Sequence, residues 1–181
     1  MQRLPIGIDD FRELREGGYA YVDKTRLIYE LIHTAKFIFL SRPRRFGKSL
    51  LTTTLRELFL GNAALFEGLW IADQIEWTPY SVILLNFNDL DYRTKSLADA
   101  LAEEMDKQAR LHGMTLDSAE YKGKFLGLIE RLAERSKVVL LVDEYDKPIT
   151  DLLENSEKVA EHIDTLKNFY AVLHYRTENV F

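Results

Sequence analysis

A glycine, a lysine and a serine stand together at positions 47, 48 and 49, after a basic turn and the apolar run Phe37–Leu40. The residues that follow Ser49 have the apolar spacing of a helix. A strand, a tight loop and a helix in this order let loop amides and a helix N-terminus converge on one phosphate group. In such a loop the lysine reaches the β and γ phosphates, and the serine hydroxyl ligates magnesium. The pattern therefore predicts that Lys48 contacts phosphate and that Ser49 binds the metal ion.

The loop departs from the standard phosphate-binding pattern, because Arg42 stands where its first glycine is expected. Pro43 fixes its own φ at about −65° and biases Arg42 towards an extended backbone, so this loop should leave its strand differently. Contacts from Arg44 and Arg45 to phosphate or to a partner protein both remain open. We predict that the nucleotide is held by the loop and the first helical turn: Arg44, Arg45, Phe46, Gly47, Lys48, Ser49 and Leu50.

A second apolar stretch, Val138–Val142, ends in two carboxylates, Asp143 and Glu144. Ligands of parallel sheets gather at the carboxyl ends of strands. Asp143 is therefore predicted to hold magnesium, and Glu144 to orient or deprotonate an attacking water. Lys48 and Glu144 are the catalytic candidates. Asp146, just beyond them, fits either a supporting role at this site or a cap of the next helix.

Each motif also has a plainer interpretation. A Gly-Lys-Ser tripeptide can follow a buried strand by chance, and an acidic turn after a core strand is common in α/β proteins. The two motifs occur in the order that a nucleotide site requires, which favours nucleotide binding with hydrolysis. A nucleotide sensor without turnover and a phosphotransferase that uses the same loop remain the alternatives.

Apolar strands alternate with helical segments along the chain, which is typical of a parallel sheet with helices on both faces. We expect one α/β domain over residues 1–181. The expected strands cover residues 36–40, 82–87 and 137–142. The expected helices lie near residues 10–14, 25–32, 48–60, 95–111, 121–135 and 157–175.

The composition narrows the functional classes. The chain has 181 residues, of which 46% are hydrophobic, and a formal net charge of −5, so we expect no direct nucleic-acid binding by this domain. It has no cysteine, its four histidines lack metal-ligand spacing, and no apolar run approaches the roughly 20 residues that span a bilayer. We therefore expect a cytoplasmic protein without membrane contact, and an oligomer remains open.

Several segments together resemble the AAA-ATPase-like family, a prokaryotic group in which a PD-(D/E)XK nuclease-like domain usually follows the ATPase part. The resemblance covers nearly the whole chain, and the family has Arg-Pro in place of the first loop glycine. It implies ATP and Mg²⁺ as ligands, with Lys48 and Ser49 at the phosphates and metal, and Asp143 and Glu144 at the metal and water. It also suggests Tyr21, Asp23 and Lys24 for adenine or ribose. The segments are Leu4–Gly7, Tyr21–Thr25, Leu40–Ser49, Leu65–Leu69 and Val142–Pro148.

The resemblance also implies a secondary structure for the last residues of the chain. ATPases of this class have a further strand between the loop strand and the magnesium strand, and it should begin near residues 178–181. We therefore expect a P-loop NTPase-type sheet that is incomplete at its C-terminal end, as in a truncated domain. The function expected is an ATP-binding, ATP-hydrolysing switch that couples to a nuclease-like effector.

Overall fold

The computed structural model describes residues 3–41, 43, 46–175 and 180. The predictions for Arg42, Arg44 and Arg45 lie outside these residues. The chain forms two compact units, residues 1–82 and 83–181, with the boundary inside strand β1 (Ser81–Asn86). The single domain expected from the composition stays a prediction, and each unit is described by itself.

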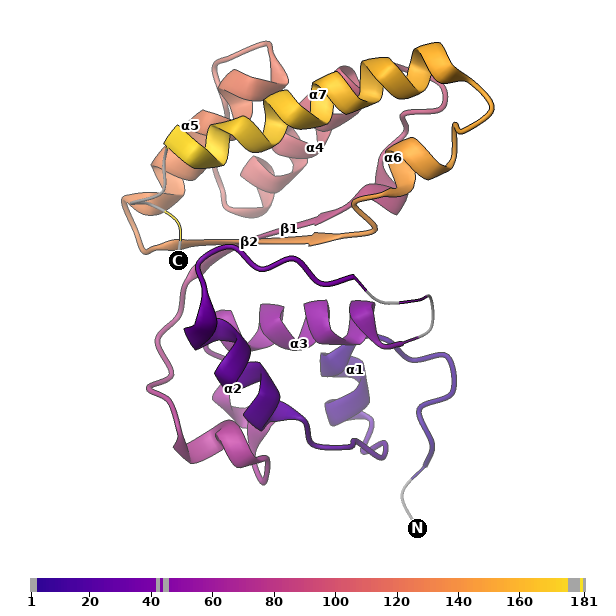
Figure 1. Cartoon of the computed structure of the whole chain (residues 1–181). Coiled ribbons are helices and arrows are strands. Elements are labelled where there is room, and N and C mark those ends of the chain that lie inside the picture. The colour runs from indigo at the N-terminus through magenta and orange to yellow at the C-terminus, as the bar shows by residue number, and fades with distance from the viewer. Residues whose placement is uncertain (1–2, 42, 44–45, 176–179, 181) are drawn as a thin grey trace. The chain divides into compact units, whose positions relative to one another are not determined.

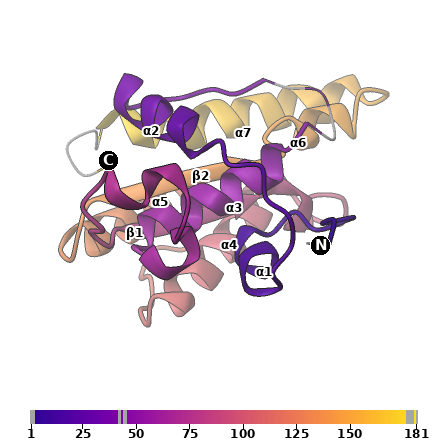
Figure 2. The same ribbon diagram turned by 90° about the horizontal axis from the view of Figure 1, so that it is seen from below.

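The first unit is built around helix α3 (Lys48–Phe59), against which the short helix α1 (Phe11–Glu16) packs (Figure 2). Helix α2 (Thr25–Thr34) and the 3-10 turns η1 (Ala63–Phe66) and η2 (Trp70–Asp73) complete it. The predicted helices α2 and α3 are confirmed, and the turn after α3 uses Gly61 at φ 75°. The core of the unit includes Phe11, Leu14, Ile28, Leu58, Phe59, Phe66 and Ile71.

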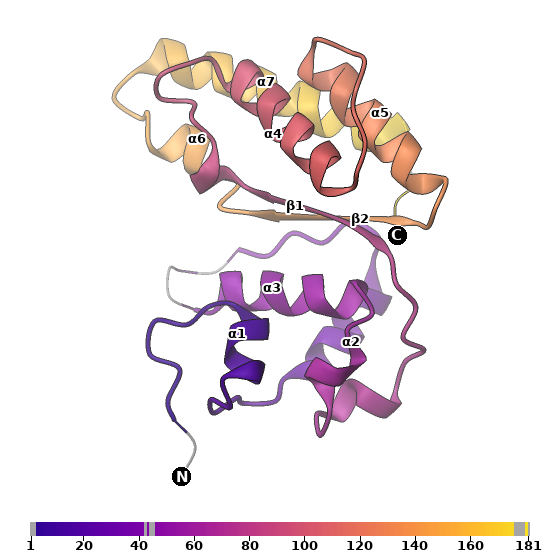
Figure 3. The same cartoon turned by 180° about the vertical axis from the view of Figure 1, so that it is seen from behind.

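The second unit is α/β. Strands β1 and β2 (Val138–Asp143) form a two-stranded parallel sheet, and helices α4 (Leu97–Leu111), α5 (Tyr121–Ala133) and α7 (Ser156–Tyr175) pack together on one side of it (Figures 1 and 3). The turn η3 (Phe87–Asp89) follows β1 and contacts the short helix α6 (Lys147–Thr150). These strands and helices confirm the α/β pattern. The core includes Ile83, Leu85, Phe87, Leu101, Met105, Phe125, Leu128 and Phe169.

Two contacts involve backbone groups of the strands. The buried side chain of Gln108 donates from Nε2 to the carbonyl oxygen of Leu84 in β1 at 2.9 Å, which satisfies a polar group of that strand. Val180 forms a parallel bridge with Val138, the first residue of β2. A full strand at this position, and the larger P-loop type of sheet, stay predictions.

The strand predicted at residues 36–40 is wrong. This segment carries no assigned strand, and Phe37, Ile38 and Phe39 are 50%, 44% and 72% exposed. An apolar run predicts an extended backbone, but a strand requires a ladder of hydrogen bonds with a neighbour. The sheet of the described residues contains β1 and β2 alone.

Candidate nucleotide site

Helix α3 begins with a free set of backbone donors. Its N-cap is Gly47, whose φ of 74° and ψ of 27° are left-handed values that glycine adopts without strain. The first helical bond runs from the Leu51 amide to the Gly47 carbonyl at 3.0 Å, and no side chain of the described residues caps the helix. Among the described residues, the amides of Lys48, Ser49 and Leu50 therefore meet no acceptor. Such a helix start attracts an anion through its N–H groups and its dipole.

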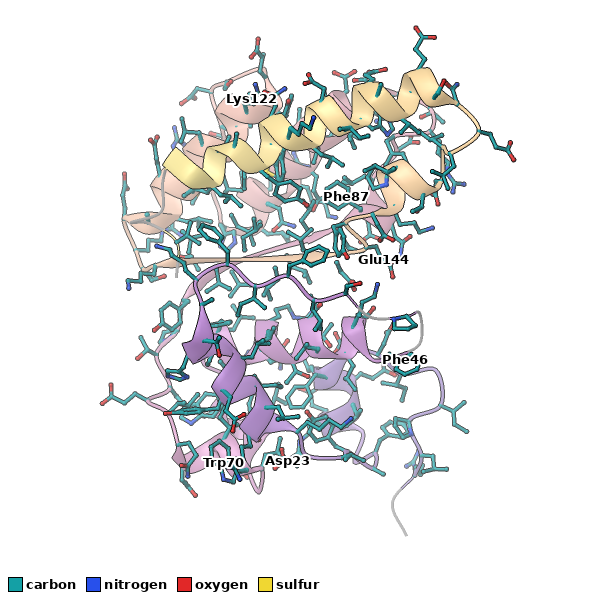
Figure 4. All side chains as sticks on the ribbon, in the orientation of Figure 1. Asp23, Phe46, Trp70, Phe87, Lys122 and Glu144 are labelled. Atoms are coloured by element: carbon teal, nitrogen blue, oxygen red, sulfur yellow. The ribbon has the colours of Figure 1, made fainter. Side chains whose placement is uncertain are left out.

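The side chains at the start of α3 also suit the binding of an anion. Lys48, Ser49 and Leu50 are half-buried, whereas Phe46 is 64% exposed and is labelled in Figure 4. Within the described part of the chain, the Lys48 ammonium makes neither an ion pair nor a hydrogen bond. A cation without a carboxylate partner strengthens the preference of this helix start for an anion.

A buried carboxylate holds α3 against the rest of its unit. Glu57 is 1% exposed, and its Oε2 accepts hydrogen bonds from Arg12 Nη2 at 2.6 Å and Asn62 Nδ2 at 2.7 Å. Its Oε1 accepts one from Arg56 Nε at 2.9 Å. This cluster ties α1 and the turn after α3 to the helix that carries Lys48. No expectation from the sequence covered this cluster, because a glutamate within a helix ordinarily faces solvent.

A second fixing point of α3 lies one turn earlier. The Thr53 hydroxyl accepts a hydrogen bond from the Phe11 amide at 3.1 Å and donates one to the Asp9 carbonyl at 2.9 Å. Together with the Glu57 cluster, this contact sets the position of α3 relative to α1. The helix start therefore belongs to an element that is held at two points against the rest of its unit.

Asp23 and Tyr21, predicted to contact the base or ribose, both serve the fold of the first unit. Asp23 Oδ1 accepts bonds from the Thr25 amide and hydroxyl at 2.8 and 2.7 Å, and Oδ2 accepts one from the Trp70 amide at 2.7 Å. Figure 4 shows Asp23 and Trp70 close together and apart from Phe46. Tyr21 packs edge-on against Phe11, and burial raises the pKa of its hydroxyl. Their contact with a nucleotide stays a prediction.

In the second unit, β2 ends in a buried carboxylate followed by a strained residue (Figure 4). Asp143 is 8% exposed, and its Oδ1 accepts a hydrogen bond from the Glu144 amide at 2.9 Å. Its Oδ2 accepts no hydrogen bond from a described residue. Glu144 has a φ of 52°, the one positive value at a non-glycine position in the described chain. Left-handed backbone at a bulky residue is costly and clusters at functional sites.

Asp146 occupies the N-cap position of α6, but its side chain makes no capping hydrogen bond. The cap that the sequence suggested is therefore not formed. Asp146 Oδ1 is instead buried without a hydrogen-bond partner among the described residues. The neighbouring Lys147 bonds elsewhere, with its ammonium 3.4 Å from Asp151 Oδ1.

No group of three His, Asp or Glu side chains in the described residues could hold a metal ion by itself. Magnesium nevertheless keeps several waters and usually binds one or two carboxylates together with substrate phosphates. Asp143, with Oδ2 unengaged, fits that mode of binding. His162, which is 3% exposed, is instead structural, with Nδ1 2.7 Å from the Pro148 carbonyl oxygen.

Comparison with known proteins shows which family this chain resembles. Residues 5–181 match the family described as "Predicted AAA-ATPase". The chain belongs to this AAA-ATPase-like family. Membership confirms the resemblance seen in the sequence and supports a general ATPase-like role with nucleotide binding.

A relative from Azotobacter chroococcum mcd 1, described as "Uncharacterized protein in vnfD 5'region", is 42% identical over 177 residues. The match covers 95% of this AAA-ATPase-like chain and 34% of the relative, so the chain spans about a third of the relative's length. No solved structure matches. In the described residues, no helix is both long enough and apolar enough to cross a membrane.

Proposed function

We propose that this chain is an ATP-binding domain that hydrolyses ATP in the presence of Mg²⁺ and acts as a switch. The start of α3 carries the proposal. Gly47 in left-handed conformation opens a helix whose first amides, among the described residues, meet no acceptor, beside a lysine that has no carboxylate partner there. Family membership supports ATP as the ligand.

The reaction assigns one role to each predicted residue. Lys48 neutralises charge on the β and γ phosphates. Ser49 and Asp143 would hold Mg²⁺, which would supply positive charge beside the transferred phosphoryl group. Glu144 accepts a proton from the attacking water as the water oxygen bonds to the γ phosphorus. The bond from that phosphorus to the bridging oxygen breaks, which gives ADP and inorganic phosphate.

The coupled effector is proposed to be a nuclease-like domain, in the manner that the family resemblance implies. This chain matches 34% of the relative's length, and the rest of the relative leaves room for an effector domain in the same polypeptide. In this arrangement the nucleotide state of the domain would switch the effector on or off.

Hydrolysis is preferred over the two alternatives because of Glu144. A second carboxylate in strained backbone, hydrogen-bonded through its amide to Asp143, suits water activation better than transfer to a substrate hydroxyl. A sensor without turnover would not need it.

A measurement of inorganic phosphate release distinguishes hydrolysis from a sensor without turnover and from a phosphotransferase. The wild-type chain should release inorganic phosphate from ATP with Mg²⁺ and without any acceptor molecule, and chelation of Mg²⁺ should stop the release. Glu144→Gln should bind ATP within about twofold of wild type and lose about 10²- to 10⁴-fold in rate, the range for general acid–base groups. Binding without release would favour the sensor, and release that requires a hydroxyl acceptor would favour the phosphotransferase.

A further inference from the structure

Asp146 presents a buried oxygen that lacks a donor. Its Oδ1 is buried and accepts no hydrogen bond from any residue that the structure describes. A buried carboxylate oxygen without a partner opposes folding, and proteins rarely keep one. Departures from local rules are expected at functional sites, where a partner that arrives with a ligand can satisfy such an atom.

The donors around Asp146 are already engaged. The amide of Lys147 bonds the Glu144 carbonyl at 3.0 Å, and the amides of Ile149 and Thr150 bond the backbone carbonyl of Asp146 at 3.1 and 2.9 Å. The first turn of α6 therefore satisfies its own backbone and leaves the Asp146 side chain out.

The nearby cations are also committed to another carboxylate. Asp151 receives the Lys147 ammonium at 3.4 Å, the Arg93 guanidinium at 2.8 Å and the Tyr92 hydroxyl at 3.0 Å. Among the described residues, Asp151 has three partners and Asp146 Oδ1 has none, so a ligand is one source of a donor for Asp146.

We propose that Asp146 is a positioning residue whose Oδ1 accepts a hydrogen bond from a water molecule of hydrated Mg²⁺ that binds with ATP. This inference rests on the proposed function. Asp146 follows Asp143 and Glu144 in the turn after β2, where a carboxylate with an open Oδ2 fits a magnesium ligand. Mg²⁺ gives up its waters reluctantly, and those waters are strong donors to a carboxylate. Groups that hold a metal's surroundings in place typically change metal affinity by 10- to 100-fold when mutated.

The test uses the whole chain with Asp146→Asn, Asp146→Ala and the control Asp151→Asn. Without ligand, both Asp146 variants should melt at or above the wild-type Tm, because the removed oxygen loses no hydrogen bond to a described residue. Asp151→Asn should melt lower, because it weakens three contacts. A lower Tm for both Asp146 variants would show a paired carboxylate and overturn the inference.

The second readout is the Mg²⁺ concentration that half-saturates the ligand-induced rise in Tm, measured with a non-hydrolysable ATP analogue. Asp146→Asn should raise this concentration by about 10- to 100-fold, while Asp151→Asn keeps the wild-type value. Analogue binding in the presence of a chelator should be equal for wild type and Asp146→Asn. An unchanged Mg²⁺ requirement in Asp146→Asn overturns this inference alone, whereas a wild-type chain that binds no analogue overturns the proposed function as well.

Discussion

The backbone N–H of Glu144 donates a hydrogen bond to Oδ1 of Asp143 across 2.9 Å, and Glu144 itself has a φ of 52°. The bond engages one oxygen of Asp143 and leaves the other without a donor from the described residues. It also helps to hold Glu144 in backbone that bulky residues avoid. This contact leaves Asp143 with one open oxygen, which suits a metal ligand. It also holds Glu144 beside it, where a base for the attacking water is proposed.

The strain at Glu144 predicts an unusual response to glycine. Glu144→Gly should relieve about 1–2 kcal/mol of left-handed strain, against about 0.5–1 kcal/mol for the added freedom of glycine in the unfolded chain. The free energy of unfolding should therefore stay equal or rise by up to about 1 kcal/mol in urea denaturation, while hydrolysis is lost.

Glu134 is the control for that substitution, because it is the C-cap residue of α5 and has an ordinary φ of −62°. Glu134→Gly should lower the free energy of unfolding by about 0.5–1 kcal/mol. A larger loss for Glu144→Gly than for Glu134→Gly would argue against functional strain at Glu144.

The buried carboxylate of Glu57 should dominate the stability of the first unit. Glu57→Ala leaves Arg12 and Arg56 without their shared acceptor, and we expect a loss of about 3 kcal/mol in the free energy of unfolding. Glu16→Ala breaks the other ion pair of Arg12, but Glu16 is 58% exposed, so the loss should stay below about 1 kcal/mol. Similar losses in urea denaturation would show that Glu57 is solvated.

Asp23 should make stability depend on pH in acid. Burial alone would raise the pKa of its carboxyl, but the hydrogen bonds from the Trp70 amide and from Thr25 outweigh it and hold the pKa below the ordinary 3.8. A carboxyl with a lowered folded pKa stabilises the protein above its unfolded pKa and loses this effect as the pH falls through the folded pKa.

Asp23→Asn should therefore lower the Tm at pH 7, and the difference from wild type should shrink below about pH 3.8. Asp73→Asn, at an exposed aspartate of η2, is the control and should follow wild type at both pH values. A difference between Asp23→Asn and wild type that stays constant down to pH 2.5 would contradict this assignment.

The elements near the candidate site were predictable where local chemistry decides them. The apolar spacing after Lys48 gives α3, and the apolar run before Asp143 gives β2. The strand expected at 36–40 failed because hydrogen bonding to a neighbouring strand is tertiary information that a run of Phe and Ile does not contain.

Three features of the site could not be predicted from the sequence, for related reasons. A glutamate within a helix suggests solvent, so the burial of Glu57 becomes visible only once α1 is packed against α3. The left-handed backbone of Glu144 and the missing partner of Asp146 are matters of geometry, which residue type does not specify. Both departures from local rules occur at the proposed functional edge, where such departures are expected.

The most direct test of the account is ATP binding by Lys48→Ala, measured by titration against wild type and Lys158→Ala. Lys158 is an exposed lysine of α7 that forms no ion pair with a described residue. Loss of the charge-assisted contact to phosphate should cost about 1.5–3 kcal/mol, or about 10- to 150-fold in Kd. We predict saturable binding by wild type and Lys158→Ala and this loss in Lys48→Ala; equal affinity of all three would contradict a phosphate site at the start of α3.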